Sequence, residues 1–274
     1  MTPEVIMARA GEGAGDQILA LNCAFAWAKQ HKTIVELEYH WVSDQDFKYV
    51  DSDPEFMGDR VDLMHSKMQE PELVHVEHVW GSVIFEQQTY EDVSAPRKWY
   101  FPNNRGLLHD KVPFSGHAGR AEWSFSEPPR ETNKIVVWDY EQNREPPREY
   151  KTSLDFTWSE VIDVARKLFP EHEIVSLSYR DSFEKAYNEI RNCSFCLGYD
   201  GMWHLVARNF GKLFVTQTGD VRHTHENTYP NCSAFNVSGD HIIKYLSRLS
   251  DPEYLKVEQG IARRYHEKRM SWYE

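Results

Sequence analysis

The chain has 274 residues and carries 31 Lys and Arg against 43 Asp and Glu, a formal net charge of −12. This length suits two α/β domains of about 130 residues each, and the acidic balance excludes a general polyanion binder, although local basic patches can still steer one. Aromatic residues make up 14% of the chain, more than a core of this size needs, so we expect some of them to line a cleft.

The cysteine content and the hydropathy pattern bear on the compartment. The four cysteines do not form the framework of a disulfide-rich secreted domain; they are Cys23, Cys193, Cys196 and Cys232. We find no secretory leader, no run of the ~18 apolar residues that a membrane span needs, and no strongly basic amphipathic helix in the first half. We therefore expect a reducing, cytoplasmic location and no membrane insertion.

The chain opens with a short strand over residues 5–8, a glycine-rich turn and a helix over residues 17–30. The turn has a G-x-G-x-G spacing that ends in Gly13 and Gly15, which is not the G-x-G-x-x-G dinucleotide fingerprint. Glycines here let the backbone approach a ligand closely. Asp16 follows them and suits the N-cap of the helix.

Three further elements follow: a strand over 33–39, a helix that starts near residue 53, and a strand over 73–78. An acidic D-x-D triplet at 51–53 precedes the helix, and we interpret it as a helix start rather than a metal motif. His75 lies three residues before His78, so the two side chains belong to opposite faces of their strand, a poor arrangement for a shared metal.

Two loops in the middle of the chain are candidate contacts for a ligand. The first, residues 96–106, interleaves basic and aromatic side chains, which suits stacking on bases or sugars. The second, residues 114–120, is glycine-spaced and is expected to face the cleft. The candidate residues in the two loops are Arg97, Lys98, Trp99, Arg105 and His117. An ordinary surface loop remains the alternative for the first.

A polar, proline-rich stretch at 126–133 is the best candidate for an interdomain linker. A strand over 134–139 begins the second domain, and a polar loop follows its carboxyl end. That loop contains Arg144, Arg148 and Lys151, and a charged loop of this kind is usually just solvated.

The second domain continues as helix, strand, helix, strand, helix and strand, an order typical of a doubly wound parallel sheet. The expected ranges are 157–169, 173–177, 181–191, 194–197, 202–210 and 213–216. Gly211 is the expected stop of the third of these helices. That helix opens directly after a buried strand, so its backbone N–H groups and the positive end of its dipole form an anion site.

A long polar loop then carries Arg222, which we expect to contact the same ligand. His223, His225 and Cys232 lack the further ligands at suitable spacing that a zinc site needs, so we predict no metal. Cys193-x-x-Cys196 straddles a buried strand rather than opening a helix, which argues against a redox or zinc role. Helices over 240–249 and 252–270 follow, and the second is basic towards its end.

Two stretches together carry a resemblance. Asp200-Gly201-Met202-Trp203-His204-Leu205-Val206-Ala207 resembles the donor-site signature of heptosyltransferase-type GT-B glycosyltransferases, although the threonine usual between the aspartate and the glycine is missing. Gly15-Asp16 resembles the Gly-Asp pair that closes the first loop in that family. The resemblance implies a GT-B fold of two Rossmann-like domains facing across a cleft, with domains over 1–130 and 131–252 and a last helix, 253–274, that crosses back.

The resemblance also implies roles for individual residues. Asp16 is the expected catalytic base of an inverting transfer that needs no metal and no cofactor beyond a nucleotide diphosphate sugar as co-substrate. The expected donor-binding residues are Gly13, Gly15, Arg144, Arg148, Lys151, Asp200, Gly201, Met202, His204 and Arg222.

The acceptor stays open at this point. The compact chain resembles bacteriophage enzymes that glycosylate hydroxymethylated pyrimidines, so hydroxymethylcytosine in double-stranded DNA is the first expectation, in host cytoplasm if the chain is phage-encoded. The loop at 97–105 and the basic last helix would hold the duplex, but the charge of −12 opposes it. A saccharide or lipopolysaccharide acceptor is the alternative. A nucleotide-sugar epimerase and a non-catalytic nucleotide-binding module are alternatives of another class.

Overall fold

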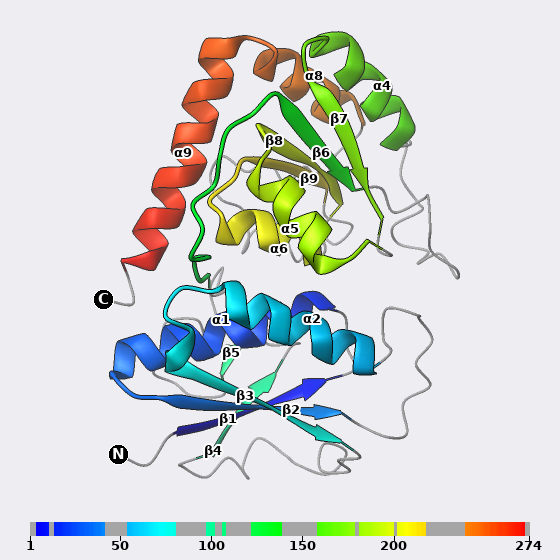
Figure 1. Cartoon of the computed structure of the whole chain (residues 1–274). Coiled ribbons are helices and arrows are strands. Elements are labelled where there is room, and N and C mark those ends of the chain that lie inside the picture. Colours follow the sequence, from blue (N-terminus) through cyan, green and yellow to red (C-terminus); the bar gives the residue numbers. More distant parts are fainter. Residues whose placement is uncertain are drawn as a thin grey trace. The chain divides into compact units, whose positions relative to one another are not determined.

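The computed structural model describes residues 4–10, 14–41, 54–80, 97–101, 106–107, 122–138, 158–178, 181–199, 202–217 and 239–271. The chain divides into two units: Met1–Glu127 with Arg269–Glu274 forms unit 1, and Pro128–Lys268 forms unit 2. Each unit is built around one sheet of mainly parallel strands, so the expectation of a mixed α/β protein is confirmed (Figure 1).

Unit 1 holds a five-stranded sheet in the order β3-β2-β1-β4-β5, in which only the β4–β5 pair is antiparallel. Its elements are β1 (Glu4–Ala10), α1 (Ala14–His31), β2 (Val35–Trp41), α2 (Pro54–Lys67), the 3-10 helix η2 (Pro71–Leu73), β3 (Val74–Trp80), β4 (Arg97–Phe101) and β5 (Gly106–Leu107). Figure 1 shows α1 and α2 on the same face of this sheet. The strand order runs outward from β1 to β3 and resumes on the other side of β1, so the topological switch point lies between β1 and β4.

Helix α1 is the centre of the unit 1 core. Residues 17–28 are all buried, without a polar face. A helix that is apolar nearly all round needs cover on every side. Part of that cover is Trp123, whose ring stacks on Phe25 at a centroid distance of 5.5 Å. This burial holds α1 in one position against the rest of the unit 1 core.

The segment expected as a basic and aromatic loop is instead strand β4, and the loop prediction is wrong for residues 97–101. β4 pairs in parallel with β1, with Val5 opposite Arg97 and Ala8 opposite Tyr100. Consecutive aromatic residues favour strands. The pairing cannot be read from the local sequence, because the partner strand lies about ninety residues earlier in the chain.

Unit 2 holds a four-stranded, fully parallel sheet in the order β7-β6-β8-β9. Its elements are β6 (Lys134–Trp138), α4 (Trp158–Leu168), β7 (Glu173–Leu177), α5 (Phe183–Arg191), β8 (Phe195–Tyr199), α6 (Met202–Asn209), β9 (Phe214–Gln217), α8 (Gly239–Leu249) and α9 (Pro252–Met270). The order reverses between β6 and β8, which is the switch point of this sheet.

Helices cover both faces of the unit 2 sheet (Figure 1). Residues of α4, α8 and α9 form one buried cluster with Ile135, Val137, Phe195 and Leu197. Helices α5 and α6 pack beside each other on the other face, where the rings of Tyr187 and Phe210 are 5.0 Å apart. The last two residues of α9, Arg269 and Met270, belong to unit 1.

Two glycines in unit 2 have structural reasons. Gly211 has a φ of +63° and ends the turn after α6, which confirms it as the helix stop. Gly198 lies opposite Trp138 in the sheet, and a Cβ at Gly198 would come within 2.4 Å of the Trp138 indole. The indole therefore lies directly over the backbone of β8, one residue before that strand ends.

Candidate functional site

Both motifs singled out in the sequence lie at switch points. In unit 1, α1 begins four residues after β1 ends, and Gly15 and Asp16 occupy its first turn. In unit 2, α6 begins at Met202, three residues after β8 ends at Tyr199. Ligands of doubly wound sheets bind outside the strand carboxyl ends at the switch point, so each motif stands where its sheet offers a site.

The start of α1 also carries a residue that sequence reasoning missed. The Gln17 side chain is only 2% exposed, and within the described ranges neither its amide nitrogen nor its amide oxygen has a hydrogen-bond partner. Buried polar groups are nearly always paired, and an unpaired one costs about 1–3 kcal/mol. The residue follows Asp16 directly, and its amide can both donate to and accept from a ligand hydroxyl.

The backbone at Gln17 is held in place from the sheet. The Tyr39 hydroxyl on β2 donates a 2.7 Å hydrogen bond to the Gln17 carbonyl oxygen. Complete burial raises the pKa of Tyr39 well above its usual value, so the phenol keeps its proton and remains a donor. This bond ties the first turn of α1 to the strand beside β1.

In unit 2 the start of α6 is packed rather than open around His204. The His204 side chain is buried, and its ring lies 4.8 Å from the ring of Phe214 on β9. Trp203 is buried as well, whereas Met202 is partly exposed. Met202 is the first residue of α6, so its backbone N–H lies at the positive end of the helix dipole.

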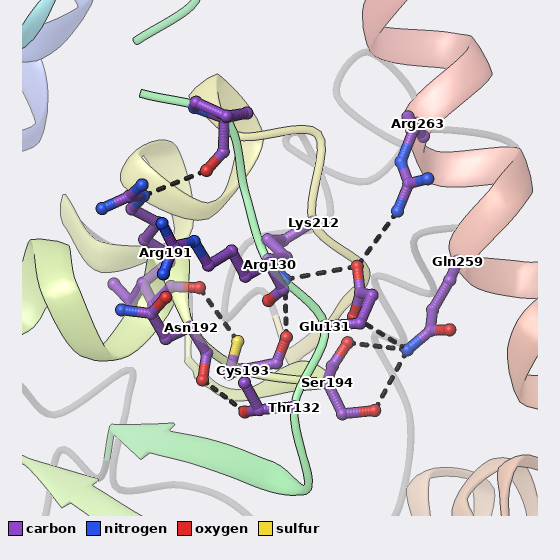
Figure 2. A network of polar contacts seen from close by, with 12 residues as sticks. Arg130, Glu131, Thr132, Arg191, Asn192, Cys193, Ser194, Lys212, Gln259 and Arg263 are labelled. Carbon is purple, nitrogen blue, oxygen red and sulfur yellow. Dashed lines mark hydrogen bonds and ion pairs between the residues drawn. The ribbon is translucent and has the colours of Figure 1, made fainter. Parts of the chain in front are cut away.

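The amino edge of the unit 2 sheet is held by a polar network (Figure 2). Lys212, with a side chain 1% exposed, donates to the carbonyl oxygens of Arg130 at 2.6 Å and Cys193 at 2.5 Å, and its ammonium lies 3.2 Å from a Glu131 carboxylate oxygen. Three acceptors satisfy all three ammonium protons. The segment before β6 and the segment before β8 are thereby fixed to each other.

Helix α9 joins this network through the same carboxylate (Figure 2). The Gln259 amide donates to Glu131 at 3.1 Å and to the Ser194 carbonyl oxygen at 2.9 Å, and Arg263 lies 3.1 Å from Glu131. The amino edge is thus a structural clamp. In doubly wound parallel sheets, ligands bind at the opposite, carboxyl edge, where α6 begins here.

Several predicted site residues lie outside the described part of the chain. These are Gly13, Arg105, His117, Arg144, Arg148, Lys151, Asp200, Gly201 and Arg222. Arg97, Lys98 and Trp99 lie in β4 rather than in a loop, with only their backbone described.

The basic end of α9 is engaged within the protein. Besides Arg263, the guanidinium of Arg269 lies 3.5 Å from the carboxylate of Glu122, and both side chains are buried. Two of the cations expected to hold a DNA duplex therefore face carboxylates of this chain.

The two cysteines of Cys193-x-x-Cys196 are both buried, with their sulfurs 3.5 Å apart. Burial, followed by the contact with Cys193, raises the pKa of Cys196 well above its usual value, which keeps the thiol protonated and unreactive. Within the described ranges, no three His, Cys, Asp or Glu side chains come together as a metal site. Nor does any helix in those ranges have the length and apolar character to span a membrane.

We compared the chain with family models, curated proteins and solved structures. No family model matches it, and no curated protein matches it. Among solved structures it is similar to the bacterial iron-containing dodecameric glycosyltransferase TibC from enterotoxigenic E. coli H10407, at a TM-score of 0.47 and 12% identity, over 96% of this chain and 77% of that one. A second structure, the TibC heptosyltransferase in complex with ADP-D-beta-D-heptose, gives a TM-score of 0.45 and 11% identity with the same coverage.

Proposed function

We propose that this protein is a glycosyltransferase that moves a sugar from a nucleotide diphosphate sugar to an acceptor hydroxyl, with inversion and without a metal. The observation that supports it most is the place of the two motifs. Gly15 and Asp16 start the helix at the switch point of one sheet, and the helix at Met202 starts beside the switch point of the other.

The proposed chemistry divides between the two units as in a GT-B enzyme. Asp16 takes the proton of the acceptor hydroxyl while that oxygen attacks the anomeric carbon, and the bond to the diphosphate breaks. The first N–H groups of α6, together with the turn at Gly201, stabilise the negative charge of the departing diphosphate. Arg144, Arg148, Lys151 and Arg222 are the proposed cations for the same diphosphate.

The acceptor we favour is a saccharide. Part of the loop expected to hold DNA, residues 97–101, is instead a strand of the sheet. On the last helix, Arg263 pairs with Glu131 and Arg269 pairs with Glu122. With a net charge of −12 the chain offers little attraction for a polyanion. A hydroxymethylcytosine DNA acceptor, the first expectation from sequence, becomes one arm of the test.

Nucleotide release separates the candidate activities. The protein is incubated with a panel of nucleotide sugars that includes ADP-heptose. Each donor is tested alone and with methyl glycosides, oligosaccharides or hydroxymethylcytosine DNA, and the release of nucleoside diphosphate is measured. Release that requires a saccharide supports the proposal. Release only with DNA would show that DNA, and not a saccharide, is the acceptor. Isomerisation of the donor without any acceptor indicates an epimerase, and nucleotide binding without turnover indicates a nucleotide-binding module.

Asp16→Asn tests the base. Removing the proton acceptor is expected to lower kcat by about 100-fold or more with little change in donor affinity. Asp163→Asn, on the exposed surface of α4 beside Arg166, is the matched control and should keep full activity. A folded Asp16→Asn protein with wild-type turnover would remove Asp16 from the mechanism.

A further inference from the structure

Two tryptophans form a stacked pair at the carboxyl ends of β2 and β3. Trp41 and Trp80 are register partners on these neighbouring parallel strands, with ring centroids 5.2 Å apart and ring planes inclined by 14°. Trp41 is 2% exposed, whereas Trp80 is 55% exposed. The outer ring of the pair is thus open, and the inner ring supports it from below.

The inner ring is held by a chain of hydrogen bonds. The Trp41 indole N–H donates to Nδ1 of His78 at 3.0 Å. A neutral His78 then carries its proton on Nε2 and donates it to a carboxylate oxygen of Asp62 on α2, 3.2 Å away. The Tyr39 ring also stacks on His78, at 5.9 Å. These contacts give Trp41 one orientation and therefore give Trp80 a rigid base.

The pair lies on the ligand-binding edge of the unit 1 sheet. β2 and β3 run parallel to β1, so their carboxyl ends share the edge at which α1 begins. β3 is two strands from β1, a spacing of about 10 Å. Tyr39, which stacks on His78, also binds the Gln17 carbonyl in the first turn of α1. The Trp pair and the proposed base therefore belong to one connected edge.

The surroundings of the pair select for a neutral, hydroxyl-bearing ring. The Asp62 side chain is 59% exposed, and Asp59, also exposed, lies one turn earlier on α2. Carboxylates repel the phosphates of a nucleotide, but they accept hydrogen bonds from sugar hydroxyls. The face of an indole carries negative charge density that attracts the slightly positive C–H groups on the apolar face of a pyranose. His78 connects the two groups: it lies 3.2 Å from the Asp62 carboxylate, and its ring is 6.1 Å from that of Trp80. A rigid indole with a carboxylate on the far side of this histidine fits a sugar better than a nucleobase with its phosphates.

We propose that Trp80, stacked on Trp41, is a subsite for one sugar ring of the acceptor, with the Asp62 carboxylate accepting a hydroxyl hydrogen bond from that ring. This inference rests on the proposed function and deepens it, because it assigns the acceptor to the saccharides. It also implies an acceptor longer than one unit: one sugar presents its hydroxyl to Asp16, and a neighbouring sugar stacks on Trp80.

The test measures sugar binding separately from turnover. Saturation-transfer NMR with methyl hexopyranosides and short oligosaccharides reports binding by the full chain without any donor. Trp80→Ala is expected to weaken oligosaccharide binding by about 5- to 10-fold, and Trp80→Phe, which keeps a ring, should lose less. Ile34→Ala is the control, because Ile34 is an exposed apolar residue that precedes β2, at the opposite edge of the same sheet.

Each outcome separates the subsite from the catalytic proposal. Trp80-dependent sugar binding without turnover on any donor supports the subsite and refutes the transferase. Turnover that depends on Asp16, with an acceptor KM unchanged in Trp80→Ala, refutes the subsite and leaves the transferase. Binding of mononucleotides but not sugars at Trp80, or wild-type sugar binding by Trp80→Ala, also overturns the subsite.

Discussion

The Gln17 side chain is buried like a core residue but carries a polar amide. It is buried in the first turn of α1, yet neither polar atom of its amide has a partner among the residues that the structure describes. In a core selected for stability alone, an apolar side chain of the same size would serve better. A ligand that pairs with the amide next to Asp16 would offset this cost.

Gln17→Met makes this explanation testable. Methionine keeps the volume and removes the unpaired amide, so the free energy of unfolding should stay the same or rise by about 1 kcal/mol. Acceptor turnover, measured as kcat/KM, should fall by about 10-fold or more. Gln259→Met is the matched control: its amide is hydrogen-bonded to Ser194 and Glu131, so this change should lower stability instead. A destabilised Gln17→Met protein with normal kcat/KM would show a purely structural amide.

At the scale of elements, the end of β8 depends on the absence of one side chain. The Trp138 indole occupies the space where a Cβ of residue 198 would stand. Trp138 is the last residue of β6 and Gly198 is the last but one of β8, so this contact lies at the carboxyl edge of the unit 2 sheet.

Gly198→Ala should therefore destabilise the protein by about 1–3 kcal/mol, because a buried indole has little room to move. Chemical denaturation measures the loss. Gly260→Ala on α9 is the contrasting variant: its Cβ would meet only the end of the flexible Arg264 side chain, so we expect no loss or a gain of about 0.5–1 kcal/mol. Equal stability of Gly198→Ala and the wild type would mean that the indole moves freely.

The helices and strands themselves were predictable along most of the described chain. The expected strand at 173–177 and helix at 252–270 have those bounds, and α1 begins three residues earlier than expected. Helical spacing and strand alternation record which side of a segment faces the core, so they are readable locally. β4 was missed because its pairing with β1 is not a local property.

At the scale of the whole molecule, the end of the chain is tied to unit 1 by a buried ion pair. Arg269 and Glu122 are both nearly inaccessible to solvent, and their charged groups are 3.5 Å apart. Breaking such a pair leaves a buried charge without its counter-ion, which is costly even where the intact pair contributes little.

Arg269→Met is expected to lower the free energy of unfolding by about 3–5 kcal/mol, and Arg269→Met combined with Glu122→Met should recover part of that loss. Urea denaturation of the single and double variants measures both values. Arg263→Met, which removes a half-exposed partner of Glu131, is the control and should cost about 1 kcal/mol or less. A single variant as mild as this control would show that Glu122 is neutralised by other means.

Periodicity and turn chemistry within short segments were enough to predict the α/β class, the position of most described elements and the two motifs that begin α1 and α6. The strand orders, and with them the switch points beside those motifs, could be read only from the folded chain. It alone also revealed the unpaired Gln17 amide and the register that stacks Trp41 under Trp80. The physical reason is that a strand's pattern records that it has a buried face, while the identity of its partner depends on contacts between segments far apart in the chain.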